Sequence, residues 1–341
     1  MKKLILAALI IGAFSACTKS SVQYEQPGEI SIRPVAAKAT KAVYGAIDGT
    51  EYHEDESFNV WAWWGNVPAG TELDAFPAYP EIYIHDGTFA FEYSYGAWRG
   101  NTPYYWPTEG SLVFAGYSPA SAYNDALLFN YRWTEKIFEI RGYKQSTDIS
   151  KTNDLMWFDA TVRSYSDNGA VPVVFHHILS WLTFTFQLKD GVESSHTVTN
   201  VKLTGIETEA RFTSKPAAGN PEWTDHYLTD EVQIWSGSQG LSSTPVTLES
   251  TSDGVLVIPQ SCANENAQLE ITYYVGNNSF DLKTKILYLT YFTEGEDGNV
   301  NNVWEPGKHY IYNIIFSADN EILVMPEVDD WITETVDIEI Q

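Results

Sequence analysis

The feature that most constrains the fold is a succession of short runs rich in β-branched and aromatic residues, which starts near Tyr44 and continues along the chain. In residues 58–64, for example, Phe58, Val60 and Ala62 fall on one face of an extended strand, because successive side chains of a strand point to opposite faces. Gly, Pro, Asp or Asn closes each run, and no stretch of about twelve residues keeps a clean helical period. The pattern predicts an all-β protein built from β-sandwiches.

A loop rich in Ser, Asp, Asn and Gly at residues 164–170 is the candidate boundary between two domains. It divides the chain into an N-terminal β-sandwich, 44–169, and a C-terminal β-sandwich, 170–341. Each part is long enough to bury a core of its own.

The N-terminus has the form of a secretory signal peptide. Two lysines precede the apolar run 4–14, which has about eleven residues, whereas a membrane-spanning helix needs roughly twenty. Residues 14–17, Phe-Ser-Ala-Cys, resemble a bacterial lipobox, in which the cysteine is acylated and becomes the first mature residue. The sequence therefore predicts a signal peptide at 1–17 and an exported lipoprotein, held to the membrane by acyl chains on Cys17.

Cysteine content and charge narrow the classes of partner. Cys17 and Cys262 are the only cysteines, so acylation of Cys17 leaves no intrachain disulfide and the core alone must hold the fold. The chain has 45 acidic and 20 basic residues, a formal net charge of −25 at pH 7. Because such a surface repels polyanions, we expect no nucleic-acid partner.

Residues 18–43 are predicted to be a tether, since they are rich in Ser, Thr, Lys, Ala, Gln and Pro. Within it, residues 29–33 alternate, so that Ile30 and Ile32 share one face of a short strand.

The alternation is sharpest in residues 331–341. Ile332, Val336, Ile338 and Ile340 share one face, which only Glu334 interrupts. A strand of this kind can add to a sheet edge in its own molecule or in a neighbour. Burial of the four aliphatic side chains would contribute roughly 6–10 kcal/mol before ordering costs.

No catalytic motif stands out. The sequence has no Cys-x-x-Cys, Gly-x-Ser-x-Gly, phosphate loop or dinucleotide fingerprint. His176 and His177 are neighbours on a predicted strand and point to opposite faces, so they do not suit one metal ion. The acidic turn at 294–299 lacks the full spacing of a calcium loop. We therefore predict no enzymatic activity, no cofactor and no metal site.

Aromatic residues make up 14% of the chain and allow two interpretations. Trp61 and Trp63 share a strand face opposite Phe58 and Val60, so both faces of that strand need partners. Large aromatic side chains usually pack in cores and between sheets. Exposed rings also stack on sugars, which makes Trp61 and Trp63 candidates for contact with a surface glycan.

Several stretches, in order along the chain, resemble the fimbrillin superfamily of Bacteroidetes. A strand of the form Pro-apolar-x-Phe-x-His-x-Leu-small begins at Pro172 and is similar to the family's mid-chain signature. The other similar stretches are 104–119, 154–156, 258–260, 304–310 and 328–331.

The resemblance implies two stacked transthyretin-like β-sandwiches of Greek-key topology. It also implies a lipoprotein precursor that is exported to the outer membrane and becomes part of a fimbrium. In family members that polymerise, a protease trims the N-terminus, usually after Arg, and the first strand leaves. The C-terminal strand of the next subunit then fills the groove, so the implied partners are other fimbrial subunits joined head to tail.

This sequence departs from the family at the processing site. Arg33 is the only Arg in the tether, and Pro34 follows it, which disfavours cleavage by a protease of trypsin-like habit. Lys38 and Lys41 are alternative sites. An uncut chain would keep its lipid and its first strand, and would serve as an anchor. Three functions stay open: a stalk or tip-adhesin subunit, a lipid-anchored anchor subunit, and a monomeric surface lipoprotein that binds glycans.

Overall fold

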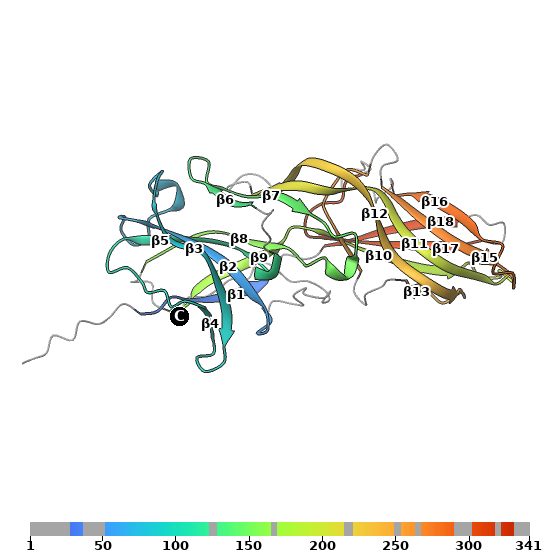
Figure 1. Ribbon diagram of the computed structural model, residues 1–341, viewed down its shortest axis with the longest axis horizontal. Helices are drawn as coiled ribbons and strands as arrows, with labels where there is room; N and C mark the ends of the chain where they lie inside the picture. Colours follow the sequence, from blue (N-terminus) through green and yellow to red (C-terminus); the bar gives the residue numbers. More distant parts are fainter. Residues whose placement is uncertain are drawn as a thin grey trace, which may run out of the picture.

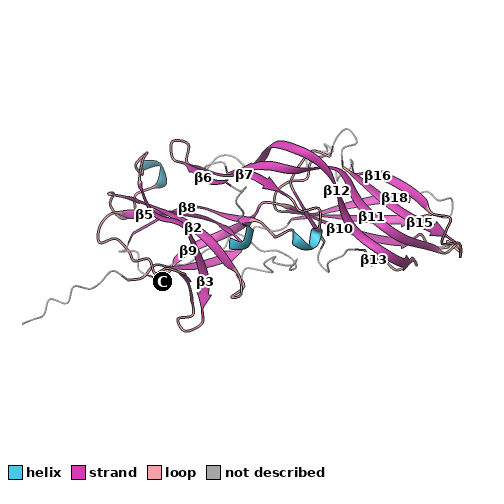
Figure 2. Ribbon diagram, viewed as in Figure 1, coloured by secondary structure: helices cyan, strands magenta, loops and turns pink. Residues whose placement is uncertain are grey.

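The computed structural model describes residues 28–36, 52–122, 128–164, 169–214, 221–248, 254–262, 267–289, 302–317 and 322–330. Within these residues the regular structure consists of strands and three 3₁₀ turns (Figure 2). The turns are Leu73–Ala75, Ala120–Ala122 and Ile149–Lys151. The predicted all-β class is therefore confirmed.

Seven strands form a closed barrel at one end of the molecule (Figure 1). They are β1 (Ser31–Ala36), β2 (Ser57–Gly65), β3 (Glu81–Glu92), β4 (Ala97–Gly100), β5 (Ser111–Ser118), β8 (Met156–Ser164) and β9 (Val171–His177). Their order around the barrel is β1-β4-β3-β2-β5-β8-β9. The barrel closes because β1, from the tether, pairs antiparallel with β4 and parallel with β9.

Eleven further strands form two sheets. The five-stranded sheet contains β10 (Ser180–Leu188), β13 (Val246–Thr247), β14 (Val255–Val257), β17 (Lys308–Phe316) and β18 (Ile322–Asp330). The six-stranded sheet contains β6 (Leu128–Arg132), β7 (Ile137–Lys144), β11 (His196–Thr213), β12 (Glu222–Gly240), β15 (Gln268–Val275) and β16 (Lys283–Tyr288). Alternate side chains of the two sheets share one buried cluster, with Phe184 and Phe186 of β10 against Val201 and Leu203 of β11.

The long strand β11 joins the two ends of the molecule. Its first part pairs with β15, whereas its last part pairs with β7, where Ala210 lies opposite Tyr143 and Phe212 opposite Ile140. The β6–β7 hairpin thus leaves the barrel half of the chain and extends the other sheet (Figure 1).

The β6–β7 hairpin also explains why β2 is apolar on both faces. Phe58, Val60 and Ala62 point into the barrel core. Trp61 and Trp63 point outward into a second cluster, with Phe138 of β7 and Tyr131 of β6. Both faces are therefore covered, one by the barrel and one by the hairpin.

The change from barrel to sheets falls after His177 and not after residue 169. Strand β9 pairs antiparallel with β8, so the polar segment at 164–170 joins two strands of the same barrel. Its composition is that of a surface turn, which resembles a linker in sequence alone. Ile178 and Leu179 connect β9 of the barrel to β10. The Ile178 carbonyl accepts a hydrogen bond from Trp223 Nε1 (2.6 Å), and the Leu179 carbonyl accepts one from the Gly307 N–H (2.9 Å).

Candidate functional site

The candidate site is the space between β4 and β9 that β1 occupies, here called the β1 position. Ser31 lies opposite Arg99 of β4, and Ile32 lies opposite both Trp98 of β4 and Val171 of β9. Parallel pairing with β9 continues to Ala36. Ahead of β1, the Ile30 N–H donates to the Tyr104 carbonyl (2.7 Å). A single short segment therefore closes the whole barrel.

Two isoleucines of this segment fill the barrel core. Ile30 is fully buried and Ile32 is 1% exposed, in a cluster that includes Phe58, Phe89 and Phe175. Full burial of an aliphatic side chain of this size contributes about 1.5–3 kcal/mol. The two residues expected from the alternation to share a strand face thus lie on the inner face of the barrel.

The ladder between β1 and β9 contains two prolines. Pro34 of β1 and Pro172 of β9 lie in paired registers, with Arg33 opposite Pro172 and Pro34 opposite Val173. Proline has no N–H to donate, and in sheets it is usually confined to edges. Neither proline interrupts this ladder, because alternate residues of a parallel strand turn their N–H groups away from the partner, and the bonds run through Arg33 and Val173.

One charged contact links the segment before β1 to β4. The Arg99 guanidinium forms an ion pair with Glu29, and both side chains are 17% exposed. A second carboxylate, that of Glu92, lies 2.9 Å from Arg99, whose guanidinium carbon lies 3.8 Å from the centre of the Tyr95 ring. The arginine is thus held in place by residues of β3 and of the β3–β4 turn, independently of Glu29.

The predicted processing residues divide between described and undescribed parts of the chain. Arg33 is exposed, but the bond to Pro34 lies in the paired part of β1. A protease pairs with the backbone of its substrate, and the backbone of β1 is already paired with β9, so we expect β1 to leave the barrel before this bond is cut. Lys38 and Lys41 lie outside the described residues, as do Cys17 and the strand residues Ile332, Val336, Ile338 and Ile340.

A buried polar pair stands next to the barrel's last strand. His177 Nδ1 lies 2.7 Å from Asp154 Oδ2, and both side chains are at most 1% exposed. His176, on the opposite face of β9, has its pKa lowered by burial and by His177. The sequence placed Asp154 and His177 in two stretches similar to one family but did not predict their contact, because 22 residues and the whole of β8 separate them along the chain.

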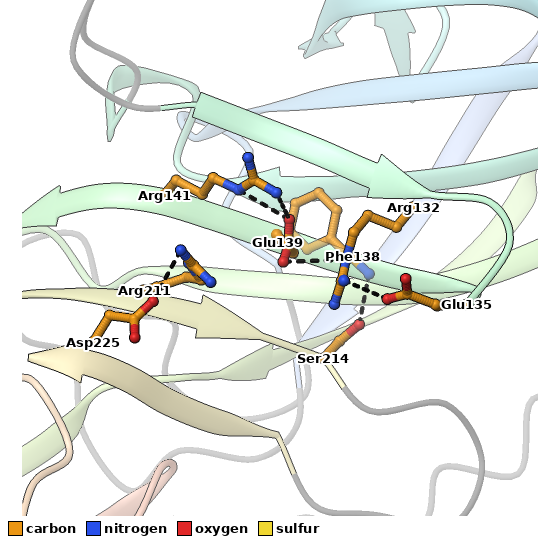
Figure 3. Close-up of polar contacts among 8 residues, drawn as sticks. All are labelled: Arg132, Glu135, Phe138, Glu139, Arg141, Arg211, Ser214 and Asp225. Atoms are coloured by element: carbon orange, nitrogen blue, oxygen red, sulfur yellow. Dashed lines mark hydrogen bonds and ion pairs between the residues drawn. The ribbon is translucent and has the colours of Figure 1, made fainter.

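A second polar cluster lies on β6, β7, β11 and β12 (Figure 3). Glu139, 1% exposed, accepts from Arg141 Nη2 (2.6 Å) and faces Arg132 Nε (3.1 Å). Arg211 pairs with Asp225 at 2.9 Å. Each carboxylate drawn in Figure 3 has a guanidinium partner, so the cluster ties strands together and offers no poised acid or base.

The expectation that Trp61 and Trp63 contact a glycan is corrected by their burial. They are 8% and 7% exposed, because the β6–β7 hairpin covers their face of β2. The most exposed large apolar side chains of the described residues are elsewhere, at Phe280 (94%) and Tyr79 (86%).

The described part of the chain contains no group of three or more His, Cys, Asp or Glu side chains arranged to hold a metal ion. Within the same residues, no helix has the length and apolar character needed to cross a membrane. Cys262 is buried, and burial raises the pKa of its thiol. The β1 position, bordered by β4 and β9, suits strand pairing.

The model of the fimbrillin-like family matches residues 40–331. The chain belongs to the fimbrillin-like family. This confirms the resemblance carried by residues 104–107 and 171–180. No curated protein sequence matches this fimbrillin-like chain.

Solved structures share the fold of this fimbrillin-like chain at low sequence identity. A fimbrial protein from Bacteroides vulgatus is 14% identical, with a TM-score of 0.60 over 89% of this chain and 99% of the other. A candidate cell adhesion protein from Bacteroides ovatus is 17% identical, with a TM-score of 0.52 over 90% and 99%. Another from Parabacteroides distasonis is 12% identical, with a TM-score of 0.51 over 90% and 98%.

Proposed function

We propose that this chain is a subunit of a cell-surface fimbrium that polymerises by strand exchange. The family supports a role in fimbriae, and the similar structures from Bacteroides vulgatus and Bacteroides ovatus are described as fimbrial and cell adhesion proteins. The observation that carries the mechanism is the place of β1: a short N-terminal segment closes the barrel and fills its core with Ile30 and Ile32.

Loss of the N-terminal segment would turn the barrel into an acceptor. With β1 gone, β4 and β9 each present unpaired backbone groups, and the cavities left by two isoleucines open onto the groove. An incoming strand satisfies both needs, since its main chain completes the ladders and its side chains enter the cavities. The alternating face of residues 331–341 has the aliphatic side chains to do so.

The same exchange explains growth of a filament. The donor segment follows β18 at one end of the chain, whereas the acceptor groove lies in the barrel, so each contact joins two different surfaces. A head-to-tail contact of this kind does not close on itself unless its rotation makes a ring. In this proposal the precursor is an outer-membrane lipoprotein through Cys17, and its partners are other fimbrial subunits.

Deletion of residues 332–341 is expected to abolish filaments, because no donor strand is left to fill the groove. Electron microscopy of cells measures the filaments. Gel electrophoresis of heated samples measures the polymers, which separate as a series of bands (heat-resistant ladders). A finer pair of variants separates the two faces of the strand: Ile338→Asp with Ile340→Asp removes the aliphatic face, whereas Thr333→Asp with Thr335→Asp adds the same charge to the other face. The proposal is supported if filaments are lost with Ile338→Asp and Ile340→Asp and are kept with Thr333→Asp and Thr335→Asp. Unchanged filaments after the deletion overturn it.

One observation favours an anchor role as the second candidate. Arg33 precedes Pro34 and lies in a strand that is paired on both sides, which disfavours cleavage there. Sequencing the N-terminus of the mature surface protein decides between the two roles. A start after Arg33, Lys38 or Lys41 indicates a polymerising stalk or tip subunit, whereas a lipidated Cys17 indicates the anchor. The glycan-binding alternative rested on Trp61 and Trp63, and both side chains are buried.

A further inference from the structure

Arg99 is the residue of the β1 position whose partners change if β1 leaves. Its contacts with Glu92 and with the Tyr95 ring come from β3 and from the turn that follows it, and these remain. Its ion pair with Glu29 comes from the segment that would be trimmed. A guanidinium that is only 17% exposed then faces the groove without one of its two carboxylates.

The last residues of the chain repeat the pattern that Arg99 contacts. Residues 29–33 read Glu-Ile-Ser-Ile-Arg, and residues 337–341 read Asp-Ile-Glu-Ile-Gln. Both have an acidic residue, then two isoleucines separated by one polar position. In the first segment the isoleucines point into the core and the acidic side chain points outward to Arg99.

We infer that Arg99 selects the incoming strand of a neighbouring copy by its acidic side chains, with Asp337 in the place of Glu29. The inference rests on the proposed strand exchange and names the residue that makes it specific. Ile338 and Ile340 then take the places of Ile30 and Ile32, so the two buried cavities receive side chains of the same volume. The incoming strand runs in the direction of β1, antiparallel to β4 and parallel to β9.

Two further positions fit this register. Val336 takes the place of Gly28, where an added Cβ would meet no atom within 4 Å. Glu334, the residue that interrupts the apolar face, falls ahead of Gly28 and outside the segment that closes the barrel. The charged side chain therefore needs no place in the core.

A register shifted by two residues is the rival arrangement. It puts Val336 at the place of Ile30, which leaves a gap, and Asp337 at the place of Ser31, opposite Arg99. Ile340 then enters the buried place of Pro34, which the inferred register leaves empty. A gap in a core costs stability, and each register leaves one. The two registers differ in what lies opposite Gln341: Pro172 in the inferred register and Val174 in the shifted one, because these residues lie opposite positions 33 and 35.

Charge reversal in the full-length chain tests the recognition. Asp337→Arg leaves the Arg99–Glu29 pair of the uncut chain in place, and we expect it to reduce heat-resistant ladders about tenfold. Adding Arg99→Glu should restore them, with Glu29→Arg included so that the uncut chain keeps an opposite pair and Glu92→Gln included so that no second carboxylate meets the new one. Glu334→Arg is the matched control, since it makes the same change of charge outside the groove, and we expect ladders at the level of the unmodified chain.

Thiol pairs test the register while Arg99 and Asp337 stay in place. Gln341→Cys with Pro172→Cys should give crosslinked polymers on oxidation, whereas Gln341→Cys with Val174→Cys should not; the native Cys262 is buried and does not compete. Crosslinking of the second pair alone overturns the inferred register. Normal ladders in Asp337→Arg overturn the recognition by Arg99. If Ile338→Asp with Ile340→Asp also polymerises normally, strand exchange itself fails, so the two failures are distinguishable.

Discussion

Ile32→Ala is expected to lower the free energy of unfolding of the uncut chain by about 2–5 kcal/mol and to leave assembled fimbriae unchanged. The loss follows because Ile32 is 1% exposed in the barrel core, and a truncated side chain there leaves a cavity that the neighbours fill only in part. The polymer should be insensitive because, in the proposed assembly, the trimmed subunit no longer contains residue 32. Chemical denaturation of the purified uncut chain and the dissociation temperature of the fimbriae measure the two effects.

Val173→Ala is the matched control for this difference. Val173 lies opposite Pro34 on β9, is 2% exposed in the same core, and stays in the subunit whether or not the N-terminus is cut. We expect a loss of about 2 kcal/mol in the uncut chain and a lower dissociation temperature of the fimbriae as well. If Ile32→Ala also weakened fimbriae to the same extent, β1 would still be present in them, and removal of the strand would be wrong.

Asp154→Ala is expected to destabilise the chain by about 2–5 kcal/mol in thermal or denaturant unfolding. The carboxylate is fully buried 2.7 Å from His177 Nδ1, so its removal leaves the imidazole buried beside an empty space without this charged neighbour. His177 is the last residue of β9 and comes just before the step to β10. The change therefore acts where the barrel and the two sheets join.

Glu231→Ala provides the comparison for Asp154→Ala. It removes a carboxylate 2.9 Å from Lys202, in a pair whose glutamate is 62% exposed. Solvent screens such a pair, so we expect the unfolding midpoint to stay within experimental error. Equal effects of the two variants would show that the burial of the Asp154–His177 pair carries no extra stability.

Local alternation predicted the parts of the β1 position but not their arrangement. Residues 29–33 alternate, and Ile30 and Ile32 are both buried in the structure. Nothing in that stretch shows that its partner is β9, about 140 residues away, or that the pairing is parallel. Pairing between distant strands depends on which edges are free once the other strands are in place, and a local pattern carries no information about distant edges.

The exposure of the two tryptophans of β2 also depends on a distant part of the chain. The period of two correctly placed Trp61 and Trp63 on the face opposite Phe58 and Val60. Whether that face meets a ligand or another strand depends on the β6–β7 hairpin, which leaves the barrel to pair with β11. Exposure is a property of what covers a face, so the suggestion of a glycan contact could be corrected only by the structure.

By itself, the sequence determined the all-β class, the faces that alternate along each strand and the similarity to the fimbrillins. These follow from the period of the side chains and from the residues at turns, which act over a few positions. Only the tertiary structure decided that a tether segment closes the barrel, that Arg99 holds Glu29 and that Asp154 meets His177. Such contacts join residues far apart in the chain, and their free energy depends on burial and on neighbours that exist only after folding.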